Sequence, residues 1–157
     1  MKIVLKLKED TQKDTKDVIE YFVSYGYDEF IVFTENKDNL ISRELKLYYE
    51  NNQISVLCLL RESTSTTRDL LQKINSSLDK FILVYSKNVC NMDLDNLLYT
   101  YHIELPIATL GIYSGKMVVA IFDKELFDYF DDARSLEKDV LERIGEDMEL
   151  AIYEENK

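Results

Sequence analysis

The sequence predicts an α/β domain in which a mostly parallel central sheet carries helices on both faces, and three observations lead to this prediction. An almost unbroken apolar run at residues 81–85 is typical of a strand that is buried on both sides. A polar loop at 86–91 and a helical repeat of leucines after Asp93 follow it, as in a strand–loop–helix unit. The length of 157 residues, with 46% hydrophobic and 31% charged residues, fits one globular domain spanning residues 1–157.

The first part of the chain predicts a strand followed by an amphipathic helix. Apolar and basic residues alternate over residues 1–7, which indicates a strand. Apolar residues at helical spacing over 17–25 indicate a helix, with Asp14 or Thr15 as its cap and Gly26 as its end.

The rest of the chain continues this alternation of strands and helices. Thr66 followed by Asp69 indicates a cap ahead of a helix, and Ser114-Gly115 indicates a turn between two strands. The predicted strands are 30–33, 54–60, 106–113, 117–122 and 150–153, and the predicted helical segments are 40–45 (Leu40, Ile41, Leu45), 70–74, 126–130 and 136–144, the last closed by Gly145.

The charge of the chain restricts its partners. A net charge of −11 works against binding to nucleic acid or to an anionic membrane, and it opposes a nucleoside triphosphate unless a local basic patch or a metal intervenes. No stretch resembles a signal peptide or is long enough to span a bilayer. Cys58 is expected in the core and Cys90 in a loop, without the spacing of a disulfide framework or a metal site. These features predict a cytoplasmic protein.

The loop after the central strand is the predicted ligand region. In an open α/β sheet, ligands bind beyond the carboxyl ends of the strands. An enzyme would place a metal-binding carboxylate there, whereas this chain has Ser86 and Lys87. A lysine ammonium carries three donors and no lone pair, so Lys87 is unable to ligate a hard cation.

The segment from 79 to 102 resembles the sugar nucleotidyltransferases, and most closely their glucose-1-phosphate cytidylyltransferase branch. That branch has a strand ending in a pattern like L-T-Y-G-D-G-V and then a helix like D-L-x-x-L-L-x-x-H. The matching positions here are Leu83, Val84 and Tyr85 in the strand, Val89 in the loop, and Asp93, Leu94, Leu97, Leu98 and His102 in the helix. With further matches over 17–46 and 119–153, the resemblance implies a Rossmann-like, pared-down nucleotidyltransferase domain.

The resemblance also implies a degenerate site, because the catalytic elements of the family have no match here. Ser86 and Lys87 replace the Gly-Asp pair whose aspartate holds magnesium in the family. Residues 9–14 contain no glycine where the family has a G-x-G-T-R-type loop around the triphosphate. The E-K-P motif and the second metal-binding aspartate also lack counterparts. Magnesium–CTP and magnesium–UTP are therefore not expected to bind.

Three further positions are weaker candidates. Arg68 corresponds, within one position, to the arginine of the family's T-G-G-R-L segment and is a candidate ligand-binding remnant; the alternative is an exposed arginine beside a helix cap. Asp93 and Asp95 form a D-x-D string, which binds a divalent cation in nucleotide-sugar glycosyltransferases. The favoured alternative is that they are acidic residues of a first helical turn, where the helix dipole stabilises them. His102, the lone histidine, is interpreted as a charge partner at a helix end.

Together these observations favour a catalytically inactive protein, a pseudoenzyme, that acts by binding or by regulating a carbohydrate-biosynthesis enzyme, without catalytic residues or a cofactor. We expect a homodimer or a complex with a larger biosynthetic enzyme, and no nucleic-acid or membrane partner. Two alternatives remain: a remnant nucleotide-sugar enzyme (cytidylyltransferase or D-x-D glycosyltransferase) with a relocated metal site, and a small-ligand sensor. An exposed apolar patch for association is expected at Ile112, Tyr113, Phe127, Tyr129, Phe130 and Tyr153.

Overall fold

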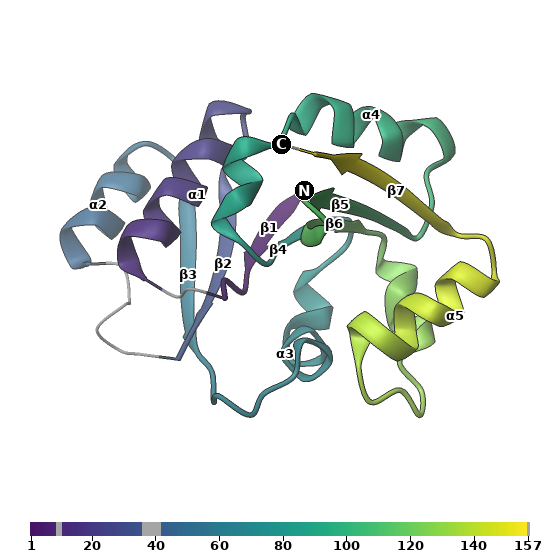
Figure 1. The fold of residues 1–157 in the computed structure, drawn as a ribbon. Coiled ribbons are helices and arrows are strands. Elements are labelled where there is room, and N and C mark those ends of the chain that lie inside the picture. Colours follow the sequence, from purple (N-terminus) through teal and green to yellow (C-terminus); the bar gives the residue numbers. More distant parts are fainter. Residues whose placement is uncertain (9–10, 36–41, 157) are drawn as a thin grey trace.

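A computed structural model of the chain describes residues 1–8, 11–35 and 42–156. These residues contain one sheet with the strand order β3-β2-β1-β4-β6-β5-β7 (Figure 1). The strands are β1 (Lys2–Leu5), β2 (Glu29–Thr34), β3 (Ser55–Leu60), β4 (Phe81–Val84), β5 (Ala108–Tyr113), β6 (Lys116–Phe122) and β7 (Leu150–Glu155). Among the described strands, four of the six pairings are parallel, and those of β6 with β4 and with β5 are antiparallel.

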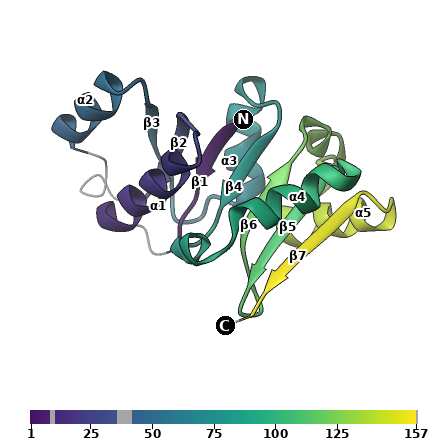
Figure 2. The same ribbon diagram turned by 90° about the horizontal axis from the view of Figure 1, so that it is seen from above.

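Helices cover both faces of the sheet, which confirms the predicted fold class. The helices are α1 (Gln12–Ser24), α2 (Arg43–Asn51), α3 (Thr67–Ile74), α4 (Leu94–Glu104) and α5 (Leu141–Glu146). Figures 1 and 2 show α1, α2 and α4 on one face and α3 and α5 on the other. Each face has its own core: Phe22, Tyr49 and Leu97 pack on the first, and Leu71 and Ile144 on the second.

The run at 81–85 forms the central strand, as predicted. β4 lies fourth among the seven described strands, between β1 and β6, and all four of its side chains are fully buried. It pairs in parallel with β1 and antiparallel with β6, so it has a neighbour on each side. Because β2 and β3 extend from one side of β1 and β4 lies on the other, the strand order reverses between β1 and β4. This reversal sets the position of the candidate site.

The start of α1 differs from the prediction. The helix begins at Gln12, and Thr11 is its cap, with its hydroxyl accepting a hydrogen bond of 3.1 Å from the Asp14 amide. Asp14 and Thr15 were expected as caps, but both lie inside the helix and are buried. A cap needs extended backbone, which Thr11 has, with φ −103° and ψ 152°. The predicted end is confirmed, since Gly26 follows the helix with φ 93°.

The region from 124 to 149 is less regular than predicted. Residues 126–129 of the predicted helix lie in a 3₁₀ turn, Lys124–Tyr129, and Phe130 follows it. A single π-helical turn, Leu136–Val140, precedes α5. Gly145 lies within α5, so the prediction that it closes the helix is wrong; Met148 has the positive φ of 60° instead. Of the predicted helix at 40–45, Leu40 and Ile41 lie outside the described residues, and Leu45 is in α2. Cys58 is half-buried because β3 is an edge strand.

No described helix combines the length and the apolar character that crossing a membrane requires.

Candidate functional site

A cavity of about 670 Å³ opens where the sheet reverses its strand order. Its wall includes Lys6 to Lys8, which follow β1, and Tyr85 to Asn88, which follow β4. Backbone hydrogen bonds continue past the strand ends, from the Lys6 amide to the Val84 carbonyl at 2.9 Å and from the Lys8 amide to the Tyr85 carbonyl at 3.0 Å. The carboxyl ends of neighbouring parallel strands at a reversal of this kind are the usual ligand site of an open α/β sheet. The volume lies within the range of small-molecule sites, about 300–1,000 Å³.

The wall of this cavity is basic. Among the described residues, five lysines and arginines line it against a single carboxylate, Glu35. The five basic residues come from four different strand ends: Lys6 and Lys8 after β1, Arg61 after β3, Lys87 after β4, and Lys116 at the start of the antiparallel β6. In a chain of net charge −11, this is the local basic patch that would allow an anion to bind.

Arg61 is the most deeply buried of these basic side chains for which an ion pair is found, with 8% of the side chain exposed. Its Nη1 forms an ion pair of 2.7 Å with Glu35, and its backbone amide donates to the Thr34 carbonyl at 2.8 Å. Its Nε is buried and finds no hydrogen-bond partner within the described residues. A buried donor without an acceptor is costly. Arg61 also lines the cavity, so its guanidinium contributes positive charge to the wall beside Glu35.

Lys6 lies half-buried beside this guanidinium. Burial lowers the pKa of Lys6 below its usual value, and the positive charge of Arg61 lowers it further, against the raising effect of Glu137 and Glu35. A lowered lysine pKa shows that its charged form lacks full compensation. An anion in the cavity would supply that compensation.

Ser86 and Lys87, the predicted degenerate site positions, both line the cavity. The Ser86 hydroxyl accepts a hydrogen bond of 3.1 Å from the Asn88 amide and so begins a 3₁₀ turn, Lys87–Asn91. The Lys87 ammonium lies 3.6 Å from the carboxylate of Asp14, which belongs to the first turn of α1 and is 9% exposed. The Lys87 side chain is 53% exposed and lines the cavity, so it pairs with Asp14 while part of it remains accessible.

Tyr85 connects the cavity to the π-helical turn. Its hydroxyl donates a hydrogen bond of 3.1 Å to Glu137. Burial raises the pKa of Tyr85 well above its usual value, and the charge of Glu137 raises it further, so the phenol stays protonated and remains a donor.

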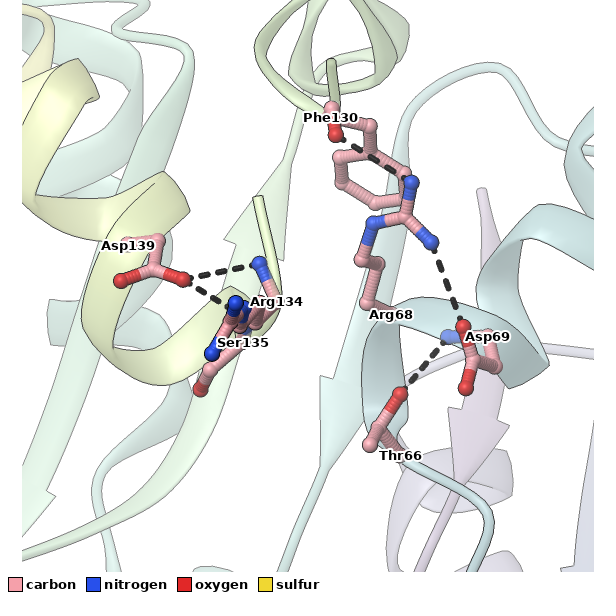
Figure 3. A network of polar contacts seen from close by, with 7 residues as sticks. All are labelled: Thr66, Arg68, Asp69, Phe130, Arg134, Ser135 and Asp139. Carbon is pink, nitrogen blue, oxygen red and sulfur yellow. Dashed lines mark hydrogen bonds and ion pairs between the residues drawn. The ribbon is translucent and has the colours of Figure 1, made fainter. Parts of the chain in front are cut away.

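Arg68, the predicted ligand-binding remnant, does not line this cavity. Its guanidinium donates to the Phe130 carbonyl at 3.2 Å, pairs with Asp69 at 3.2 Å and lies 5.6 Å from the centre of the Phe130 ring (Figure 3). It therefore links α3 to the 3₁₀ turn before Phe130, and a ligand-binding role for it stays a prediction. The Thr66 cap of α3 is confirmed by the 3.1 Å bond from the Asp69 amide to its hydroxyl.

Figure 3 also shows the cap of the π-helical turn. One carboxylate oxygen of Asp139 accepts the amides of Arg134 at 2.8 Å and Ser135 at 3.1 Å. These two hydrogen bonds are the main cause that lowers the pKa of Asp139. The carboxylate thus fixes the segment that carries Glu137.

Asp93 and Asp95 lie at the start of α4, and neither lines the cavity. Asp93 caps the helix, with its carboxylate accepting the Asn96 amide at 3.2 Å and the Asn96 side-chain nitrogen at 2.9 Å. His102 lies in the last turn of α4. Within the part of the chain that the structure describes, no three metal-ligating side chains cluster in a way that could hold a metal ion.

The expected association patch is largely packed inside the molecule. Phe130 is buried, and Tyr113, Tyr153, Phe127 and Tyr129 pack against the two cores. The prediction of an exposed patch is therefore wrong: none of the six residues is exposed, and those other than Phe130, including Ile112, are half-buried.

Sequence comparisons and structural comparisons give different results. Neither a protein-family model nor a curated protein sequence matches the chain. Among solved structures, a candidate glucose-1-phosphate thymidylyltransferase from Bacillus anthracis in complex with sucrose has a TM-score of 0.70 and 7% identity, covering 98% of this chain and 86% of that one. HddC from Yersinia pseudotuberculosis has a TM-score of 0.62 and 12% identity, covering 99% of this chain and 90% of its own.

A candidate nucleotide-diphospho-sugar transferase from Desulfovibrio desulfuricans G20 is also similar. Its TM-score is 0.55 at 10% identity, and the match covers 99% of this chain and 79% of the other. At such identities the likeness concerns the fold. The chain therefore has a nucleotidyltransferase-like α/β fold, with sugar nucleotidyltransferases among its structural neighbours.

Proposed function

We propose that this chain is a non-catalytic relative of the sugar nucleotidyltransferases, with the cytidylyltransferase branch as its nearest resemblance, and that it binds a phosphate-bearing small molecule without turning it over. The observation that carries the proposal is the basic cavity at the strand reversal, which five lysines and arginines line among the described residues. The proposed role is binding or regulation in carbohydrate biosynthesis, and a cytoplasmic location stays a prediction.

A phosphate group fits the chemistry of this wall. Guanidinium groups recognise phosphate through paired hydrogen bonds, and lysine ammonium groups attract it as point charges. The named substrates of two structural neighbours, glucose-1-phosphate and a nucleotide-diphospho-sugar, also carry phosphate. A phosphate-bearing ligand that is bound without turnover is consistent with both the pseudoenzyme interpretation and the alternative of a small-ligand sensor.

The residue in the cavity wall after β4 supports a non-catalytic role. Lys87 lies where the resemblance implies a metal-binding aspartate, and its ammonium is unable to replace a carboxylate ligand. The alternative D-x-D site is disfavoured because Asp93 is engaged as the cap of α4.

Two measurements test the proposal. Pyrophosphate release from CTP or UTP with glucose-1-phosphate and magnesium is expected to stay at the background rate, and steady turnover would show an enzyme. Thermal unfolding in the presence of inorganic pyrophosphate or UDP is expected to shift upward, because a ligand that binds the folded state stabilises it. If neither compound changes unfolding with or without magnesium, the binding role is wrong.

The proposal also includes association, with a second copy as the favoured partner. In the described sheet, β7 pairs on one side only, and the exposed apolar side chains near it are Tyr99, Ile103, Leu105, Met148 and Ile152. Figure 1 shows α4, which carries Tyr99 and Ile103, beside β7. An edge strand can pair with its own copy across a two-fold axis, which closes the assembly at a dimer.

Light scattering on the purified chain tests this part. The expected mass is twice the 18.5 kDa of one chain. Ile152→Lys should give the monomer, whereas Leu57→Lys, at an exposed apolar position of the other edge strand β3, should not. A wild-type mass of one chain at micromolar concentration would exclude the homodimer; a complex with a larger biosynthetic enzyme stays a prediction.

A further inference from the structure

We propose that the cavity binds a ligand with two linked phosphate groups as the free anion, with protein side chains taking the place of a divalent metal. This inference rests on the proposed function and specifies its ligand. Three features of the cavity support it: the spread of the basic residues, the position of Lys87 beside Asp14, and the shortage of carboxylates in the wall.

The basic residues are spread along the sheet edge. Arg61 follows β3 and Lys116 begins β6, and four strand intervals separate these two strands in the sheet. At about 4.8 Å per interval, their strand ends lie about 19 Å apart. The basic head groups reach inward from these ends to the wall of a cavity whose volume of 670 Å³ is that of a sphere about 11 Å across. One phosphate group with a hydrogen bond of about 2.7–2.9 Å on either side bridges roughly 8 Å, so it does not reach head groups on opposite walls. A ligand with two anionic groups fits the spread better.

The two sides of the cavity offer different contacts. On one side, Arg61 and Lys6 lie close enough for the charge of the first to lower the pKa of the second, and the Arg61 Nε lacks an acceptor. On the other side, Lys87 pairs with Asp14 and has a half-exposed side chain, and Lys116 is exposed at the start of β6. Each side therefore has two basic side chains, one of which is paired with a carboxylate, and Lys8, which follows β1, is the fifth basic residue of the wall.

The wall is poorly suited to a magnesium–phosphate complex. Magnesium is held by carboxylates together with phosphate oxygens. Glu35, the carboxylate found among the described wall residues, is already paired with Arg61 at 2.7 Å. A divalent ion would reduce the negative charge of the ligand and would meet ammonium and guanidinium groups of its own sign. Magnesium is therefore expected to compete with the protein for the ligand.

Isothermal titration on the full chain tests the inference, in buffer free of phosphate and sulfate, with either EDTA or millimolar magnesium. The probes are inorganic pyrophosphate, UDP, UDP-glucose and, for a single phosphate, glucose-1-phosphate. We expect the three diphosphates to bind in EDTA, and to bind about tenfold more weakly when magnesium is present. Glucose-1-phosphate should bind about tenfold more weakly than pyrophosphate, because it loses charge-assisted hydrogen bonds.

A matched pair of variants locates the site. Lys87 follows β4 at its carboxyl end and Lys80 precedes the same strand at its amino end, so both substitutions remove one positive charge. Lys87→Ala should weaken pyrophosphate binding about tenfold in EDTA, and Lys80→Ala should leave it within about twofold. Equal losses in the two variants would overturn the assignment to this cavity.

Other outcomes separate this inference from the proposed function. Binding that requires magnesium, or is equal with and without it, overturns the metal-free site while a phosphate-binding role stands. Equal affinity for glucose-1-phosphate and pyrophosphate overturns the two-phosphate ligand. If no probe binds in either buffer, both proposals fail. If UDP binds no more tightly than pyrophosphate, the diphosphate alone is recognised, which supports the inference and excludes a base pocket.

Discussion

Replacing Glu35 by glutamine should make the protein less stable and its cavity a stronger anion site. The Glu35 carboxylate is the ion-pair partner of Arg61, whose side chain is 8% exposed. Removing one partner of a fully buried pair costs about 3–5 kcal/mol. Glu35 itself is 44% exposed, and solvent screens its charge, so a smaller loss of about 1–2 kcal/mol in the free energy of unfolding is expected. For a chain of this length, that loss lowers the melting temperature by about 3–6 °C.

The same change should strengthen anion binding. A sphere of the cavity's volume, 670 Å³, has a radius of about 5 Å, so a carboxylate in the wall lies roughly that far from the centre. It repels one negative charge there by about 3 kcal/mol at an effective dielectric constant of ~20. Salt at 0.15 M, with a screening length of about 8 Å, reduces this to about 1.5–2 kcal/mol. Glu35→Gln should therefore bind pyrophosphate at least about tenfold more tightly.

Thermal unfolding in EDTA, with and without millimolar pyrophosphate, measures both effects. Without ligand the variant should melt below the wild type, and with saturating ligand the two should converge, since a tenfold gain in affinity adds about 1.4 kcal/mol. The control is Glu29→Gln, at the amino end of the same strand β2, where the carboxylate is 56% exposed and 4.0 Å from Lys2. It should change neither quantity. Equal pyrophosphate shifts in Glu35→Gln and wild type would refute the reasoning.

Three further predictions concern other residues. Gly111→Ala should destabilise the protein by about 1–3 kcal/mol in urea unfolding, because a Cβ there collides with the Val119 side chain at the irregularity in the β5–β6 pairing. An unchanged urea midpoint of unfolding would contradict the prediction. Burial raises the pKa of Cys90 to about 11, which leaves about 100-fold less thiolate at pH 8 than a thiol of pKa 9.0 has. Because a thiolate of higher pKa is the stronger nucleophile, in a Cys58→Ser background the thiol should react with a disulfide reagent about tenfold more slowly than that reference thiol. Lys6→Met should raise the melting temperature at pH 7 and weaken pyrophosphate binding. Because the pKa of Lys6 is lowered, its charged form destabilises the folded state below that pKa, so the difference in stability between variant and wild type should shrink as pH rises toward 10.5. A constant difference from pH 7 to 10 would refute this prediction.

The elements of the sheet were predictable because their signals are local. The run at 81–85 is typical of a buried strand, and its first four residues form the fully buried β4. The predicted start of α1 was wrong because several neighbouring residues carry the same helix-cap signal. Thr11, Asp14 and Thr15 are all residue types found at helix caps, and only the extended backbone of Thr11 decides between them.

The candidate site could be predicted only in part. The loop position of Ser86 and Lys87 follows from the rule that ligands bind beyond the carboxyl ends of strands, and both residues line the cavity. Arg61 was missed, although it directly follows the apolar run of β3, whereas Lys87 lies three residues after the end of β4. What the sequence lacks is the order of the strands, which brings these ends to one edge.

The sequence by itself determined the fold class, the central strand and the excess of negative charge, because composition and apolar periodicity are properties of the chain read in order. Tertiary structure alone decided where the basic residues, the less frequent charges in this acidic chain, come together. Lys6, Arg61, Lys87 and Lys116 are separated by up to 110 residues (116 − 6), yet they line one cavity. Electrostatic interaction falls with distance in space and not along the chain, so a basic site can form in an acidic protein once the sheet places these strand ends side by side.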